Sequence, residues 1–412
     1  MFVNTLLDYE NDPEKLELLY KEQPDKFELD LSGALNQKPD SITFRVWATR
    51  LNIKLPQKEN TSPTLITVIT LSVFAGLVAK VPAFFLNENW FYPRFAPFVA
   101  LMATAIYFLY VINVGYLKRL VGIFCLITII YLSLLPDWST SSSVTMALIH
   151  LPLACWIITG IVFSKGKWQE KESRIKFISY SGELIILSSL ILIGGAVLTG
   201  MTIALFQVIG IELEDKFIET ILPIGAAATP VVGTYIYDVV LQRKMKLAST
   251  LSKVFAPLFL VLLFAFIVTA AVQGLPFLYD RDYLIIFNAL LLVILCISLF
   301  SLTDQDQLKE KSLLRRTSIS LITATVVVDL MALYAISFRL FEYGFSLNRF
   351  YVLTINILIL GHLMYLLFPY VNSIRNGHRT RDMTDAVVNY FPVYATWIVL
   401  ATFLLPFVFS FK

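Results

Sequence analysis

The sequence is poor in charged residues. Charged side chains make up only 15% of its 412 residues, whereas 57% are hydrophobic and the mean hydropathy is +0.72. A soluble domain normally carries a larger charged fraction, which keeps its surface dispersed in water. The shortage of charge therefore excludes an ordinary water-soluble protein. The formal net charge is only +3, which gives no indication of a nucleic-acid-binding surface.

Residues that carry common catalytic and metal-binding chemistry are also scarce. The chain has three cysteines and three histidines. None of them has the spacing of a zinc site or of a disulfide framework, and the cysteines lie inside apolar segments as small hydrophobic residues. Neither a GxSxG nor a GxxxxGK(S/T) motif occurs. We therefore expect no catalytic residue, no metal and no cofactor.

About eleven long apolar segments fill the chain after residue 63. A helix needs roughly 20 apolar residues to cross about 30 Å of hydrocarbon. Only helices and closed barrels satisfy their backbone polar groups in lipid, and these runs are too uniformly apolar for barrel strands. We therefore predict an all-α, polytopic transmembrane helix bundle over 61–412 whose main partner is the lipid bilayer. The segments lie near 64–84, 95–114, 120–136, 144–163, 184–208, 217–240, 254–274, 283–302, 318–340, 350–370 and 388–410.

Positive charge gathers in every second loop between these segments. Lys and Arg are retained on the cytoplasmic side of a membrane. The positive residues of the alternate loops are Lys118, Arg119, Lys165, Lys167, Lys171, Arg174, Lys176, Arg243, Lys244, Lys246, Lys253, Lys309, Lys311, Arg315, Arg316, Arg375, Arg379 and Arg381. The loops between them hold only Arg94, Lys216, Arg281, Arg339 and Arg349. This asymmetry predicts eleven spans with the N-terminus inside and the C-terminus outside.

Residues 1–60 form a polar, acidic segment with no visible cleavable signal peptide. Asp12 followed by Pro13 is typical of a helix start. Three short amphipathic helices are expected, with apolar stripes that include Leu16, Phe27 and Phe44. We predict a small cytoplasmic helical segment that ends in a linker over 56–63. Its role stays open between a solvated cap and a ligand-sensing domain.

Two polar residues stand at the middle of predicted spans. Asp329 interrupts the run VVVDLMALY, and Thr325 lies one helical turn before it. His362 lies at a similar depth in the next span, and Tyr365 follows it. Charged groups are costly in hydrocarbon, so they mark either a functional site or interhelical hydrogen bonds that hold the bundle together. We hypothesise a proton- or substrate-binding site formed by these four residues.

The predicted span 217–240 is unusual in its glycine and proline content. Pro223 and Pro230 each remove a helical hydrogen bond. Gly225, Thr229 and Gly233 form a stripe of small residues along one face. Small residues favour close helix packing, and a proline-broken helix can also line a cavity. Both interpretations stay open.

The stretch 341–361, FEYGFSLNRFYVLTINILILG, carries a family resemblance. Glu342, Tyr343, Gly344, Asn348 and Arg349 resemble the corresponding element of the bacterial membrane proteins grouped as the domain of unknown function 4153 family. The resemblance is clear over 320–370 and implies a bacterial inner-membrane protein. Together with Arg339, the charged residues Glu342 and Arg349 are expected to form an ion-pair cluster at the outer mouth of the Asp329 and His362 hairpin.

These features lead to competing hypotheses about function. The first is a transporter-like or permease-like protein with a polar intramembrane site for a small molecule or an ion. It predicts a cavity lined by Asp329, His362 and the span 217–240. The second is a non-transporting scaffold or sensor that signals through its N-terminal helices to protein partners as yet unknown. A third, a lipid-acting enzyme, would require several carboxylates that converge at one membrane interface.

Overall fold

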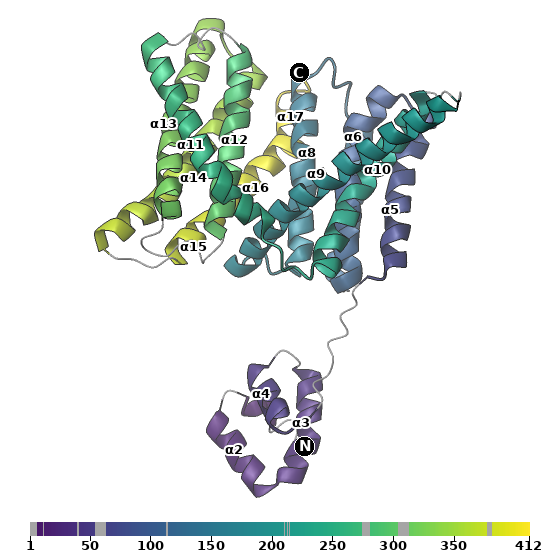
Figure 1. Cartoon of the computed structure of the whole chain (residues 1–412), viewed down its shortest axis with the longest axis vertical. Coiled ribbons are helices and arrows are strands. Elements are labelled where there is room, and N and C mark those ends of the chain that lie inside the picture. Colours follow the sequence, from purple (N-terminus) through teal and green to yellow (C-terminus); the bar gives the residue numbers. More distant parts are fainter. Residues whose placement is uncertain are drawn as a thin grey trace. The chain divides into compact units, whose positions relative to one another are not determined.

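The computed structural model describes residues 6–10, 12–38, 41–53, 63–112, 114–209, 211, 213, 215–273, 281–303, 313–376 and 381–412. Within these residues all regular structure is helical, and no strand occurs (Figure 1). The contacts divide the chain into two compact units, Met1–Ser62 and Pro63–Lys412. The predicted linker lies almost entirely outside the described residues.

The first unit contains α2 (Pro13–Glu22), α3 (Pro24–Gln37) and α4 (Ile42–Arg50). Asp12 caps α2 by accepting a hydrogen bond from the Lys15 amide, and Ser41 caps α4 by accepting one from the Phe44 amide. The predicted apolar stripes meet in one core around Leu16, Phe27 and Phe44. The amphipathic helices expected from the sequence are therefore confirmed.

The second unit is built from long apolar helices. Among the described residues, ten helices are long and apolar enough to cross a membrane, which makes the chain a multi-pass membrane protein. The elements are α5 (Leu65–Lys80), η1 (Val81–Phe84), α6 (Glu88–Ile112), α7 (Gly115–Leu134), α8 (Ser142–Phe163), α9 (Lys171–Val208), α10 (Asp215–Tyr235), η2 (Ile236–Val240), α11 (Leu247–Gln273), α12 (Arg281–Thr303), α13 (Leu313–Tyr343), α14 (Leu347–Asn376), α15 (Arg381–Asn389), α16 (Phe391–Val399), η5 (Leu400–Leu404) and α17 (Leu405–Val408).

One of the eleven predicted spans, 283–302, is not among these ten helices. It corresponds to α12, which is helical over Arg281–Thr303. The stretch Ile285–Ser301 of this helix, whose side chains the structure describes, is apolar. The last of the ten, Asp385–Val408, joins α15, α16, η5 and α17 into one crossing.

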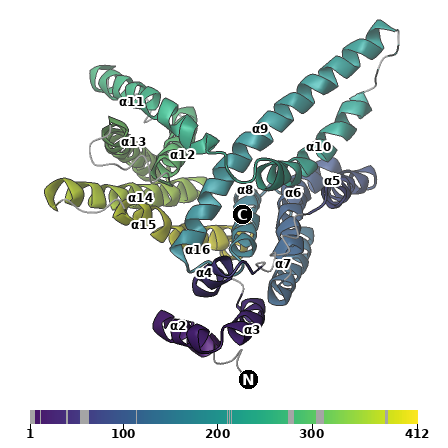
Figure 2. The same cartoon turned by 60° about the horizontal axis from the view of Figure 1, so that its bottom comes forward.

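The helix α9 begins earlier than the sequence predicts. The predicted span starts near 184, whereas α9 runs from Lys171 to Val208 (Figure 2). Lys171, Arg174 and Lys176 therefore belong to this helix and not to a loop. The reason is that Phe177, Ile178 and Tyr180 are buried against the bundle, so tertiary packing extends the helix through a charged stretch.

The helices of the second unit surround two main apolar cores. One core lies among α5 to α10 and includes Tyr107, Phe108 and Tyr180. The other lies among α11 to α15 and includes Leu321 and Leu363. Near the C-terminus, α16, η5 and α17 pack against α8 (Figure 1). This arrangement leaves apolar residues along the outer faces, where a bilayer would cover them.

Candidate functional site

Asp329 is a fully buried acid at the middle of α13. Its side chain has 0% exposure, and neither carboxyl oxygen has a hydrogen-bond partner among the described residues. Thr325 is equally buried, but its hydroxyl donates to the Leu321 carbonyl at 2.7 Å. A buried carboxyl group without a partner is costly, because its polar atoms lose water and gain nothing in return. Packing alone therefore does not explain why an acid occupies this position of α13.

His362 lies on α14, which packs against α13. Its side chain is fully buried, and its Nδ1 atom is 3.2 Å from the Tyr394 hydroxyl. The imidazole ring stacks on Tyr390 with the ring centroids 4.6 Å apart and the planes within 5°. Its other nitrogen, Nε2, has no hydrogen-bond partner among the described residues. His362 is thus held by two tyrosines of the last crossing.

Tyr394 lies near both polar residues that the sequence identifies. No hydrogen bond joins Asp329 to His362 directly. Tyr394 makes a hydrogen bond with His362, and Asp329 contributes to the electrostatic environment of the Tyr394 hydroxyl. We refer to Asp329, His362, Tyr390 and Tyr394 as the polar layer. Tyr365 is 42% exposed and approaches the layer only through Tyr390, with the ring centroids 6.3 Å apart.

Tyr390 and Tyr394 were not predicted from the sequence. Tyrosine near the end of an apolar segment is usually an interfacial anchor, so the contacts of these two rings with His362 could not be foreseen. Their spacing of four residues was the available signal, because it places both rings on one helical face. Gly361 helps to position Tyr390. A Cβ atom at Gly361 would lie 2.5 Å from the Tyr390 hydroxyl oxygen.

The cluster expected from Arg339, Glu342 and Arg349 has a different form. Arg349 donates to the backbone carbonyls of Tyr343 and Gly344, at 3.0 and 2.6 Å. The Arg339 and Arg349 guanidinium groups both lie over the Tyr343 ring, at 5.3 and 5.6 Å from its centroid. Among the described residues Glu342 forms no ion pair with Arg349.

Within this cluster the Arg349 side chain closes the turn after α13, and Gly344 supplies the positive φ of +74° that this turn requires. Arg349 therefore holds the backbone of this turn, and both arginines stack on the Tyr343 ring.

The span with two prolines stays helical through Pro223 and Pro230 and ends in the π-helical turn η2. Of the small residues Gly225, Thr229 and Gly233, Gly233 packs against a neighbouring helix and Gly225 faces open space. A Cβ atom at Gly233 would lie 2.9 Å from Leu184 of α9, whereas a Cβ atom at Gly225 meets nothing within 4 Å. The Thr229 hydroxyl donates to the Gly225 carbonyl at 2.7 Å.

The glycines of α9 do not pack against α10. A Cβ atom at Gly194, Gly195 or Gly200 would meet nothing within 4 Å. The close approach of α10 to α9 is at Gly233 of α10. A second close approach joins α10 to α5, where a Cβ atom at Gly76 would lie 2.7 Å from an Ile224 methyl carbon.

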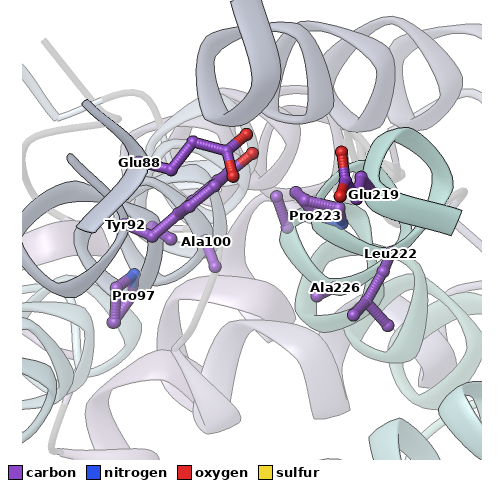
Figure 3. A pocket seen from close by; sticks show the side chains of 10 residues that line it. Glu88, Tyr92, Pro97, Ala100, Glu219, Leu222, Pro223 and Ala226 are labelled. Carbon is purple, nitrogen blue, oxygen red and sulfur yellow. The ribbon is translucent and has the colours of Figure 1, made fainter. Parts of the chain in front are cut away.

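A cavity of about 510 Å³ lies between α6 and α10 and is lined in part by Pro223 (Figure 3). Glu88 and Tyr92 border it from α6, and Glu219 borders it from α10. The transporter hypothesis predicts a cavity that joins this span to Asp329 and His362. Neither of those two residues lines this cavity.

No group of three or more His, Cys, Asp or Glu side chains that could hold a metal ion occurs in the described part of the chain. Comparisons with protein-family models, with curated proteins and with solved structures found no match. The resemblance to the domain of unknown function 4153 family therefore stays a prediction. Any function must be argued from the polar layer and the cavity themselves.

Proposed function

We propose that the chain is a transporter-like or permease-like membrane protein in which Asp329 takes up and releases a proton during transport. The observation that carries this proposal is the unpartnered carboxyl group of Asp329, buried at the middle of α13. Acidic residues inside spans are rare and mark proton or ion pathways more often than packing sites. Tyr394 and His362 would extend the path, because each carries an exchangeable proton and a hydrogen bond joins the two side chains.

The proposal includes an orientation and a location. If α12 crosses together with the ten helices described above, the chain has eleven spans. The N-terminus would then lie inside and the C-terminus outside a bacterial inner membrane. The alternation of basic and charge-poor loops supports this orientation. The length of α12 also supports it, because 23 residues at about 1.5 Å each extend roughly 34 Å, enough to cross the hydrocarbon core.

Proton movement in reconstituted vesicles tests the proposal. The protein is placed in liposomes that contain a pH-sensitive dye, and a potassium diffusion potential drives proton uptake, with and without a small-metabolite extract outside. We expect wild-type vesicles to change their internal pH faster than empty ones. We expect Asp329→Asn to fall to the empty-vesicle rate, because an amide of the same size cannot exchange the proton. Asp137→Asn, in an exposed loop, is the matched control and should keep the wild-type rate.

The alternative function is a non-transporting scaffold or sensor that acts through the N-terminal unit. The exposed apolar face of α4 favours it, since Ile42 and Val46 are 80% and 62% exposed on one side of that helix. The vesicle experiment separates the two functions. If the internal pH of wild-type vesicles changes no faster than that of empty vesicles, with or without the metabolite extract, the transport proposal is rejected. The scaffold or sensor function would then be the remaining proposal.

A further inference from the structure

We propose that the cavity between α6 and α10 binds an organic cation, with the charged nitrogen at Glu219 and the apolar body against the prolines and alanines. The volume of about 510 Å³ falls in the range of roughly 300–1,000 Å³ that is typical of small-molecule pockets. This inference goes beyond the proposed proton site and does not depend on it, because Asp329 does not line the cavity.

The sequence explains why space remains between these two helices. Ala96 and Ala100 of α6 face Ala226 and Ala227 of α10 across the cavity, and none of them is large enough to fill it. Pro97 and Pro223 also line it and have no amide N–H. Pro223 lacks the amide donor that would bond to the Glu219 carbonyl in a regular helix. The cavity therefore results from small residues and prolines on both helices and does not depend on the rotamer of one side chain.

The polar and apolar linings occupy different sides of the cavity. The oxygen atoms of Glu88, Tyr92 and Glu219 lie toward one side, while Pro97, Leu222 and Ala226 lie away from them (Figure 3). A ligand that fits this division carries a charged or polar end and a compact apolar body. An inorganic ion would leave the apolar side unfilled.

The charges around the cavity favour a cation. Lys80, which is only 4% exposed, lies 3.4 Å from a Glu88 carboxylate oxygen and 3.4 Å from the Tyr92 hydroxyl. The negative charge of Glu88 is therefore already balanced by a buried ammonium group. Glu219 has no hydrogen bond or ion pair among the described residues. A carboxylate that no described residue pairs, beside an apolar wall, is the setting in which a ligand ammonium gains a charge-assisted hydrogen bond.

Two sources could supply this chemistry. A free alkylammonium ion and the ethanolamine headgroup of a phospholipid both present a primary ammonium group. They differ in concentration and in access, because the headgroup is a permanent component of the membrane. Binding measured in membranes with and without phosphatidylethanolamine distinguishes them.

Hexylammonium is a suitable probe, and uncharged hexanol is its control. Binding to the purified full-length protein is measured by calorimetry in nanodiscs of phosphatidylglycerol. We expect hexylammonium to bind and hexanol to bind at least tenfold more weakly. Glu219→Gln should weaken hexylammonium binding about tenfold, because the amide keeps the volume but loses the charge-assisted bond. Ala226→Leu should weaken both probes by filling the cavity. Glu172→Gln, an exposed glutamate of α9, is the matched control.

Two results of these binding measurements would reject the organic-cation site. Equal binding of hexylammonium by wild type, Glu219→Gln and Ala226→Leu would overturn the proposal, and so would equal binding of hexylammonium and hexanol. Weaker hexylammonium binding in phosphatidylethanolamine nanodiscs would support the site with the headgroup as its occupant. Unchanged binding there would support it with a free amine. Failure here would leave the vesicle result for Asp329 intact, so the two proposals fail separately.

Discussion

At the scale of single residues, the buried charged side chains of this protein bond mainly to backbone groups at helix ends. Arg94 is fully buried and donates to the carbonyls of Trp90, Leu135 and Pro136. Arg174 donates to the Val388 carbonyl at the end of α15. Both arginines were predicted to lie in loops, because hydropathy does not distinguish a loop charge from a charged side chain that bonds to a helix terminus. Such bonds satisfy carbonyls that the helix itself leaves free.

Two exposed ion pairs of the N-terminal unit predict a loss of stability in acid. Arg50 donates to Glu17 at 2.9 Å, and Lys38 donates to Glu10 at 2.5 Å. These hydrogen bonds hold the pKa of both glutamates below their usual 4.5. A lowered folded-state pKa stabilises the fold above the unfolded-state value, and this stabilisation is lost as the pH falls through the folded-state pKa. We therefore expect amide protection over 13–50 to decrease below about pH 4.5.

Hydrogen exchange on the full-length protein, corrected for the intrinsic dependence of exchange on pH, measures this loss. Glu17→Gln should show a smaller decrease, because one of the two titrating groups is gone. Protection that rises in acid would contradict the assignment of these pairs.

At the scale of elements, apolar periodicity predicted the helices well, and buried charge identified only part of the site. Asp329 and His362 were found because a polar residue at mid-span is costly whatever surrounds it. Tyr390 and Tyr394 were missed because their meaning depends on which helix they meet. The continuation of α10 through two prolines was also hidden, since neighbouring helices in a bundle compensate for lost hydrogen bonds. The sequence alone shows that burying a polar side chain is energetically unfavourable, but it does not show which residue of another helix that side chain contacts.

The pairing of α5 with α10 gives a prediction about packing. A Cβ atom at Gly76 would lie 2.7 Å from an Ile224 methyl carbon and 3.4 Å from its backbone Cα. Gly76→Ala should therefore destabilise the protein by about 1–3 kcal/mol, the usual cost of overpacking. Thermal unfolding in detergent measures the change. Gly122→Ala on α7 is the matched control, because its new methyl group meets nothing within 4 Å. Equal melting temperatures for the two variants would show that α5 and α10 do not approach so closely.

At the scale of the whole molecule, contacts distant in sequence join the end of the chain to earlier helices. The Ser143 amide donates to the Lys412 carbonyl at 2.8 Å, and the Tyr131 hydroxyl donates to the Thr402 carbonyl at 2.5 Å. The last crossing also supplies Tyr390 and Tyr394 to the polar layer. The C-terminal crossing is therefore part of both the framework and the proposed site, although the sequence analysis assigned it neither role.

The side of the membrane on which this last crossing ends depends on α12. If α12 crosses, the chain has eleven spans, and its two ends lie on opposite sides. If it does not cross, ten spans place both ends on the same side. The helix of 23 residues is long enough to cross, and its stretch Ile285–Ser301 is apolar. We expect a C-terminal alkaline phosphatase fusion to be active and a C-terminal green fluorescent protein fusion to be dark, as both reporters behave outside the cytoplasm. Fusions after Lys244, expected inside, should give the opposite pair of signals. A fluorescent C-terminal fusion with an inactive phosphatase would instead show that α12 stays on one side of the membrane.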